Sequence, residues 1–244
     1  MRALDAADLL QIWERCLQAG LTDRMLVLLG AACPDVSPGE LTEIPIGRRD
    51  ALLLDLRALL FGPDLTGVAD CPGCREPLEF ALPAEYLRIR PDPPDPGVQQ
   101  LEAGGLGVVF RVPTSSDLLP LGGSDTATAR NQLLARCVLD ASGKDGDHVG
   151  CRALPDDVAA AVSGCMSAAD PQADIELALT CPSCGHEWAA PFDIASFLWA
   201  EIDACVLRLL RDVHVLARAY GWREPDVLAL SPIRRSVYLE LSQQ

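Results

Sequence analysis

The sequence has no long hydrophobic run. Hydrophobic residues make up 49% of its 244 residues, yet none of the apolar stretches reaches the roughly 18 residues that a membrane-spanning helix needs. The first twenty residues carry acidic side chains where a secretion signal is apolar. We therefore expect a cytoplasmic protein with no membrane insertion and enough apolar material for one sizeable core.

Basic residues are scarce as well. Lysine and arginine total 20 against 35 aspartates and glutamates, which gives a formal net charge of −15. Proteins that bind nucleic acid usually neutralise phosphates with a basic patch, and anionic membrane surfaces attract basic segments. The acidic excess therefore argues against nucleic acid and against anionic membranes as partners.

Catalytic motifs are missing too. The chain has only three histidines, of which His148 falls in a polar turn, His186 follows a cysteine pair and His214 lies in a helical stretch. There is no nucleophile elbow, no phosphate-binding glycine loop and no HExxH motif, and the glycines at 104–107 precede a strand, which is the wrong order for a dinucleotide fingerprint. We expect a protein that is not an enzyme.

What the sequence does contain is cysteine, ten residues in all. A disulfide framework is not expected in a chain of this size without a secretion signal. Six cysteines stand alone, and several of them lie in apolar helical stretches, where a free cysteine behaves as a small buried hydrophobe. These six are Cys16, Cys33, Cys137, Cys151, Cys165 and Cys205.

The other four cysteines form two pairs with zinc-ligand spacing. Cys71-Pro-Gly-Cys74 and Cys181-Pro-Ser-Cys184 each place two thiols at one tight turn between strand-like residues. Each such knuckle supplies half of a tetrahedral four-cysteine zinc site. The pattern predicts one structural zinc ion held by Cys71, Cys74, Cys181 and Cys184.

The gap between the knuckles is unusual. Cys74 and Cys181 are 181 − 74 = 107 positions apart, far more than the ~15–20 of a compact ribbon, so residues 75–180 are read as an insertion. Three alternatives remain: redox pairs, which lack the usual strand-to-helix setting, disulfides, and a site without metal. His186 is close enough to replace a ligand, although four cysteines make that unnecessary.

Hydrophobic periodicity predicts an α+β fold that is mainly helical, with a split zinc ribbon and a long C-terminal helix. Helices are expected at 4–17, 22–30, 48–61, 126–139, 155–166 and 194–220, with a last one starting at Pro232. Strands are expected at 66–70, 78–82, 106–112, 175–180 and 186–189, and 90–97 as a proline-rich loop.

The same pattern divides the chain into four segments. We expect an N-terminal helical segment (1–65), the split ribbon (66–82 and 175–190), an insert of short strands and helices (83–174) and a C-terminal helical segment (191–244). All four are expected to share one compact domain.

Several stretches resemble a known family. Phe192-Asp-Ile-Ala-Ser-Phe-Leu-Trp199 follows the second knuckle, the end of the chain reads Ala219-Tyr-Gly-Trp-Arg-Glu-Pro-Asp-Val-Leu-Ala-Leu-Ser-Pro232, and Arg48-Arg-Asp-Ala-Leu-Leu-Leu54 also fits. Together with the knuckles they are similar to the baseplate hub and hub-assembly, chaperone-like proteins of T-even-type contractile phage tails. Relatives occur in phage-tail-like contractile injection systems.

The resemblance implies a non-enzymatic role in building or completing a baseplate, with other baseplate or hub proteins as partners and incorporation in an injection particle. Aromatic and arginine side chains dominate binding hot spots, so the candidate partner-binding residues are Trp222, Arg223, Arg234 and Arg235. A zinc-ribbon adaptor that binds another protein or nucleic acid outside any injection machine is the alternative.

Overall fold

The computed structural model describes residues 1–90, 95–143 and 154–242. Its contacts group into two compact units, one formed by Met1–Asp35 with Ala195–Gln244 and the other by Val36–Ile194. The chain is thus a mixed fold of helices and short antiparallel sheets, as the sequence indicates. Each unit is described by itself below, and the expected single domain stays a prediction.

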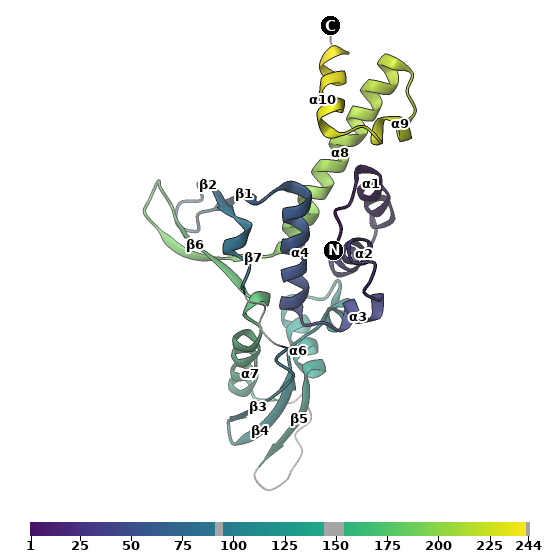
Figure 1. Cartoon of the computed structure of the whole chain (residues 1–244). Coiled ribbons are helices and arrows are strands. Elements are labelled where there is room, and N and C mark those ends of the chain that lie inside the picture. Colours follow the sequence, from purple (N-terminus) through teal and green to yellow (C-terminus); the bar gives the residue numbers. More distant parts are fainter. Residues whose placement is uncertain (91–94, 144–153, 243–244) are drawn as a thin grey trace. The chain divides into compact units, whose positions relative to one another are not determined.

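The first unit is helical (Figure 1). It opens with a capping box, in which the Asp5 side chain accepts from the backbone N–H of Asp8 and the Asp8 side chain accepts from that of Asp5. Its helices are α1 (Ala6–Arg15), α2 (Leu21–Ala32), α8 (Ile194–Tyr220, which enters this unit at Ala195), α9 (Glu224–Leu228) and α10 (Pro232–Leu241).

Two polar contacts tie the first helices to α8. The indole Nε1 of Trp13 in α1 donates to Asp203 Oδ1 at 2.7 Å, and the Arg24 guanidinium of α2 lies 4.6 Å from the centre of the Trp199 ring. A cation over an indole face is attracted by the ring quadrupole. Ile202 and Val206, on the same stretch of α8, are fully buried, so this side of the helix is an inner face.

The second unit combines helices with three small sheets. Its helices are α3 (Pro38–Glu43), α4 (Ile46–Phe61), η1 (Ala84–Tyr86), α5 (Ser115–Leu118), η2 (Leu119–Leu121), α6 (Thr126–Cys137), α7 (Asp156–Ala169) and η3 (Pro171–Ala173). Its strands are β1 (Asp64–Asp70), β2 (Pro77–Pro83), β3 (Val98–Ala103), β4 (Leu106–Arg111), β5 (Val138–Gly143), β6 (Ile175–Thr180) and β7 (Glu187–Phe192).

A hydrophobic core lies between the β3-β4-β5 sheet and helices α6 and α7. Phe110 of β4, Cys137 of α6 and Val162 of α7 are each at most 1% exposed within this cluster. The buried Cys137 behaves as the small hydrophobe expected of a single cysteine. This core holds the inserted segment together independently of the two knuckles.

Strand β3 is a correction to the sequence prediction, which had no strand at 98–103. The hairpin turns at Gly104 and Gly105, whose φ angles of 58° and 78° are those of a two-residue turn with both residues left-handed. The Gly-Gly pair therefore indicates a hairpin turn: it connects β3 to β4, whereas the sequence analysis placed it only before a single strand.

Other boundaries also shift. The helix expected at 126–139 ends at Cys137, because Val138 takes an extended backbone (ψ 118°) and begins β5, where it pairs with Phe110. Two short helices, α3 and α9, lie where no helix was expected. His148 and Cys151 lie outside the described residues, as does the centre of the 90–97 loop.

Helix α4 fixes the start of the first knuckle hairpin. The helix ends at Phe61 with Gly62 as its C-cap. The buried Arg57 guanidinium donates to the carbonyl oxygens of Gly62 (2.9 Å) and Asp64 (2.7 Å). The backbone N–H of Ala84 donates to the Pro63 oxygen at 2.8 Å and closes the base of the hairpin. The base of the β1-β2 hairpin is thus held in place at the end of α4.

Candidate metal centre

The first knuckle is the turn of the β1-β2 hairpin. The strands are antiparallel, with Asp70 opposite Pro77. Within the turn, the backbone N–H of Arg75 donates to the Cys71 oxygen at 2.8 Å, and that of Cys71 donates to the Glu76 oxygen at 3.0 Å. These bonds bend the chain so that both cysteines sit on one turn.

The second knuckle repeats this arrangement 110 positions later, in the β6-β7 hairpin, where Thr180 pairs with Glu187. Its turn bonds are those of Gly185 N–H to the Cys181 oxygen (2.9 Å) and Cys181 N–H to the His186 oxygen (2.8 Å). The pattern of buried and exposed residues along 71–80 is identical to that along 181–190. The two hairpins are therefore structural equivalents, and they lie beside each other in Figure 1.

The residue after the second cysteine has a left-handed backbone in both knuckles. Gly185 has φ 72° and Arg75 has φ 64°. Glycine reaches this region freely, whereas a side chain with a Cβ is strained there. Among the described residues Arg75 is the one non-glycine with positive φ, so the first turn keeps its shape at some cost in backbone energy.

The four thiol sulfurs of the knuckles come together. Cys71 Sγ lies 3.7 Å from Cys184 Sγ, and Cys74 Sγ lies 3.6 Å from Cys181 Sγ. All four sulfurs lie within 4.8 Å of one another. Because the first cysteine of each knuckle approaches the second cysteine of the other, the hairpins are related by an approximate twofold axis.

The donor set and its spacing suit a zinc ion. A regular tetrahedron with Zn–S bonds of about 2.3 Å has sulfur–sulfur edges of about 3.8 Å, close to the separations of 3.7 Å and 3.6 Å between the paired sulfurs. All four cysteines are free thiols. Four soft sulfur donors at these distances are compatible with one metal ion shared between the hairpins.

In each knuckle the first cysteine is buried and the second is exposed. Cys71 and Cys181 are each 1% exposed, whereas Cys74 and Cys184 are exposed. Within the first knuckle, the backbone N–H of Gly73 also points at Cys71 Sγ, 3.4 Å away. Each hairpin thus contributes one inner and one outer thiol.

Backbone hydrogen bonds, desolvation and the neighbouring thiols shift the pKa values of these cysteines. Hydrogen bonding from the backbone N–H of Cys184 is the largest influence that lowers the pKa of Cys181, to about 6. The Glu76 backbone also lowers the pKa of Cys74, but desolvation and the neighbouring thiols outweigh it and raise the value to about 12. Neighbouring thiolates repel one another, so full ionisation of the cluster calls for a cation.

His186 lies beside the cluster. A Cβ built on Gly73 would come within 3.3 Å of the His186 Cβ and Cγ atoms, so the histidine of the second knuckle packs against the turn of the first. Its ring stacks on Trp188, with centroids 6.0 Å apart. The side chain is exposed, and the cluster of candidate ligands consists of the four cysteines.

The candidate partner-binding residues lie in the first unit, between the end of α8 and α10. Trp222 packs between Tyr220 and Tyr238, with centroids 4.9 and 4.8 Å away. Arg223 and Arg234 are exposed, whereas Arg235 is buried, and its Nε lies 3.1 Å from Asp212 Oδ2. Contact of these residues with a partner stays a prediction.

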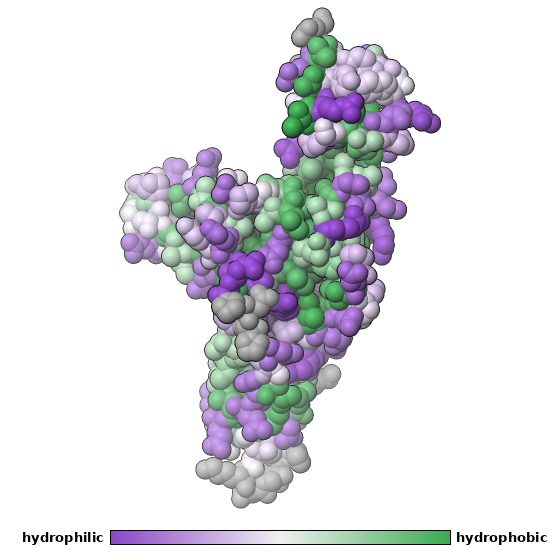
Figure 2. All heavy atoms as spheres, in the orientation of Figure 1, coloured by the Kyte–Doolittle hydropathy of each residue, from purple (hydrophilic) through white to green (hydrophobic). Residues whose placement is uncertain are grey.

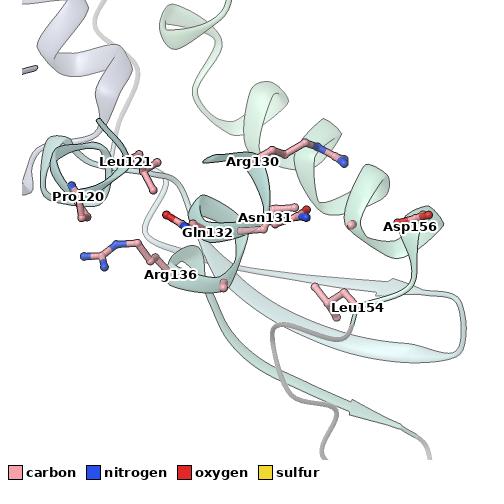
Figure 3. A pocket seen from close by; sticks show the side chains of 11 residues that line it. Pro120, Leu121, Arg130, Asn131, Gln132, Arg136, Leu154 and Asp156 are labelled. Atoms are coloured by element: carbon pink, nitrogen blue, oxygen red, sulfur yellow. The ribbon is translucent and has the colours of Figure 1, made fainter. Parts of the chain in front are cut away.

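One pocket of the second unit is polar and open. It has a volume of about 760 Å³ and is lined by residues 120–121, 130–132, 134–136, 154, 156 and 159, among which serine, cysteine and histidine do not occur. In Figure 3, Arg130 and Arg136 extend in opposite directions from α6. The two guanidinium groups do not converge on one point, so the pocket has no built anion site.

Comparison with known proteins shows where this architecture belongs. A family model described as T4 bacteriophage base plate protein matches residues 22–199. The chain belongs to this baseplate family. Curated proteins and solved structures gave no significant match. Among the described residues, the structure has no helix both long and apolar enough to cross a bilayer.

The region that matches the baseplate family includes both knuckles and everything between them. The four clustered cysteines are therefore part of the family region. The match ends inside α8, so α9, α10 and the aromatic cluster around Trp222 lie beyond it.

Proposed function

We propose that Cys71, Cys74, Cys181 and Cys184 hold one structural zinc ion that joins the two knuckle hairpins. The observation that carries this proposal is the convergence of four free thiols, 107 residues apart in sequence, to within 4.8 Å. An isolated two-stranded hairpin is marginally stable in water. Two such hairpins gain stability from a shared ion, because metal binding to a preformed site adds directly to folding free energy.

A four-cysteine site is coordinatively closed, so it offers no position for an activated water or a substrate. The role we assign to the metal is therefore mechanical. Together with the family match, this supports a non-enzymatic function: a component or assembly factor of the baseplate in a phage-tail-like contractile injection system, with other baseplate or hub proteins as its partners.

Two roles within the baseplate remain to be separated, a hub subunit and a hub-assembly chaperone. Deletion of the gene in its host should abolish complete baseplates in either case, as seen by electron microscopy of purified particles. Mass spectrometry of wild-type particles then distinguishes the roles, because a hub subunit is present at fixed stoichiometry and a chaperone is absent. Particles with complete baseplates from the deletion strain would contradict the proposal.

The zinc site is tested by Cys184→Ser with Cys205→Ser as the matched control. Cys184 is a ligand, whereas Cys205 is a half-buried single cysteine of α8. C184S should lose the zinc and at least about 3 kcal/mol of the free energy of unfolding, measured by urea denaturation and elemental analysis. C205S should keep both. Equal zinc content and stability in the two variants would exclude the shared site.

A further inference from the structure

Helix α10 presents its apolar side chains outward. Ile233, Val237 and Leu241 are 79%, 48% and 50% exposed. They follow one another at four-residue spacing, so they form one continuous ridge along the helix, of the kind that fits the groove of a second helix. Figure 2 shows apolar side chains of α10 on the surface, just below the grey chain end. We call this set the α10 ridge.

The inner face of the same helix buries a charge. Arg235 is 8% exposed and pairs with Asp212 of α8, and Tyr238 packs edge-on against Trp222 at 4.8 Å. These contacts fix the rotation of α10 about its axis. The helix thus hides a guanidinium and leaves three aliphatic side chains in water, the reverse of a surface helix that serves only its own core.

The first unit also carries exposed arginines. These are Arg208, Arg211 and Arg218 on α8 and Arg234 on α10. Arg208 acts electrostatically on Asp212, whereas Arg211, Arg218 and Arg234 take part in no ion pair within the described chain. Arginines of the second unit such as Arg111 and Arg136 are, in contrast, paired with aspartate. From Arg208 to the end of α10, the sequence holds six arginines and four carboxylates, although the whole chain has a net charge of −15.

From these observations we infer that the α10 ridge is a docking surface for an acidic amphipathic helix of another protein. The apolar groove of that helix receives Ile233, Val237 and Leu241, and its carboxylates face Arg234, the exposed neighbour of Ile233 on α10. The inference rests on the proposed baseplate function for the source of the partner. It adds the surface through which the chain binds that partner and the chemistry that the partner presents.

Other occupants fit less well. A symmetric pairing of two α10 ridges would bring Arg234 of each copy to the same contact without supplying a carboxylate for it, so a second copy of this chain is not favoured. Nucleic acid would match the arginines, but phosphates gain nothing from an aliphatic ridge and are repelled by the overall acidic charge.

The test uses a fluorescein-labelled synthetic helical peptide of about 20 residues, with leucines on one face and glutamates beside them, and the full-length protein. Fluorescence anisotropy should show saturable binding that weakens at least tenfold when Val237→Ser and Ile233→Ser are combined. Leu59→Ser on α4 is the matched control, since Leu59 is also an exposed helical aliphatic (53%). A variant of the peptide with lysines in place of glutamates should bind at least tenfold more weakly.

Three results would overturn the inference: no binding of the acidic peptide at about 100 μM, equal binding of the lysine peptide, or equal binding by the V237S/I233S variant. Sedimentation of the wild type as a dimer that the double variant dissociates would assign the ridge to self-association, and tighter binding of a labelled DNA duplex would assign the arginines to nucleic acid. None of these results touches the baseplate role, because particle assembly in the deletion strain tests that role separately.

Discussion

At the scale of single residues, the second unit depends on a buried carboxylate. Asp117 is 1% exposed and accepts two hydrogen bonds from Arg111, at 2.6 and 2.8 Å, and one from the Thr114 backbone N–H at 3.0 Å. Burial alone would raise the pKa of Asp117, but these donors outweigh it and lower the value to about 2. The carboxylate therefore stays ionised in the folded protein at any pH above that value.

Replacement of Asp117 by asparagine should lower the free energy of unfolding by about 3 kcal/mol at pH 7, because the arginines lose their buried partner. The pKa is lower in the folded state, so this stabilisation is complete above about pH 4 and disappears as the pH falls towards 2. Urea denaturation of wild type and D117N should thus converge in acid. Asp125→Asn is the control, since asparagine keeps that exposed helix cap; equal effects of the two substitutions would contradict this account.

Sequence reasoning worked for residues whose chemistry is local. Two cysteines separated by two residues indicate a metal-binding knuckle from their spacing alone. The predicted set Cys71, Cys74, Cys181 and Cys184 does come together. Asp117 was not predicted, because its importance comes from Arg111 on a strand and Arg136 on a later helix. The residues of such a cluster come from separate elements, so no fixed spacing in the sequence identifies them.

At the scale of elements, the contact between α4 and η3 relies on a missing side chain. The Gly47 backbone N–H donates to Asp170 Oδ2 at 2.8 Å, and a Cβ at Gly47 would lie 2.9 Å from the backbone nitrogen of Ala173. Backbone cannot give way as a flexible side chain can, so the helix start and the η3 turn require glycine for their close approach.

Gly47→Ala should therefore cost about 2 kcal/mol or more of the free energy of unfolding. Gly164→Ala in α7 is the control: a Cβ there meets nothing within 4 Å, and alanine favours helix, so stability should stay the same or rise by up to about 1 kcal/mol. Thermal denaturation of both variants tests this difference, and a G47A melting curve that coincides with that of G164A would exclude the close approach.

Long or strongly patterned elements were predictable, and short ones were not. The apolar stripe of α8 and the stop of α4 at Gly62 are visible in the sequence, and both helices form with nearly the predicted limits. Strand β3 and helix α9 have six and five residues, too few to show a period of their own. The paired register of a hairpin or the packing of a neighbouring helix decides such segments.

At the scale of the whole molecule, the sequence predicted the long-range link but not the grouping of the chain. Four ligands are needed to complete a zinc site, which is why two knuckles 107 residues apart could be matched without a structure. The division into two units depends on which helices share contacts, and it brings residues 1–35 together with 195–244. Periodicity within each segment holds no information about that choice.

The central claim is that one metal ion joins the two knuckles, and metal content per chain tests it most directly. Elemental analysis of protein purified without added metal, combined with a count of reactive thiols, should give one zinc per chain. Cys71, Cys74, Cys181 and Cys184 should be protected until a chelator is added. Protein that contains no metal and in which these four thiols react freely would contradict the account.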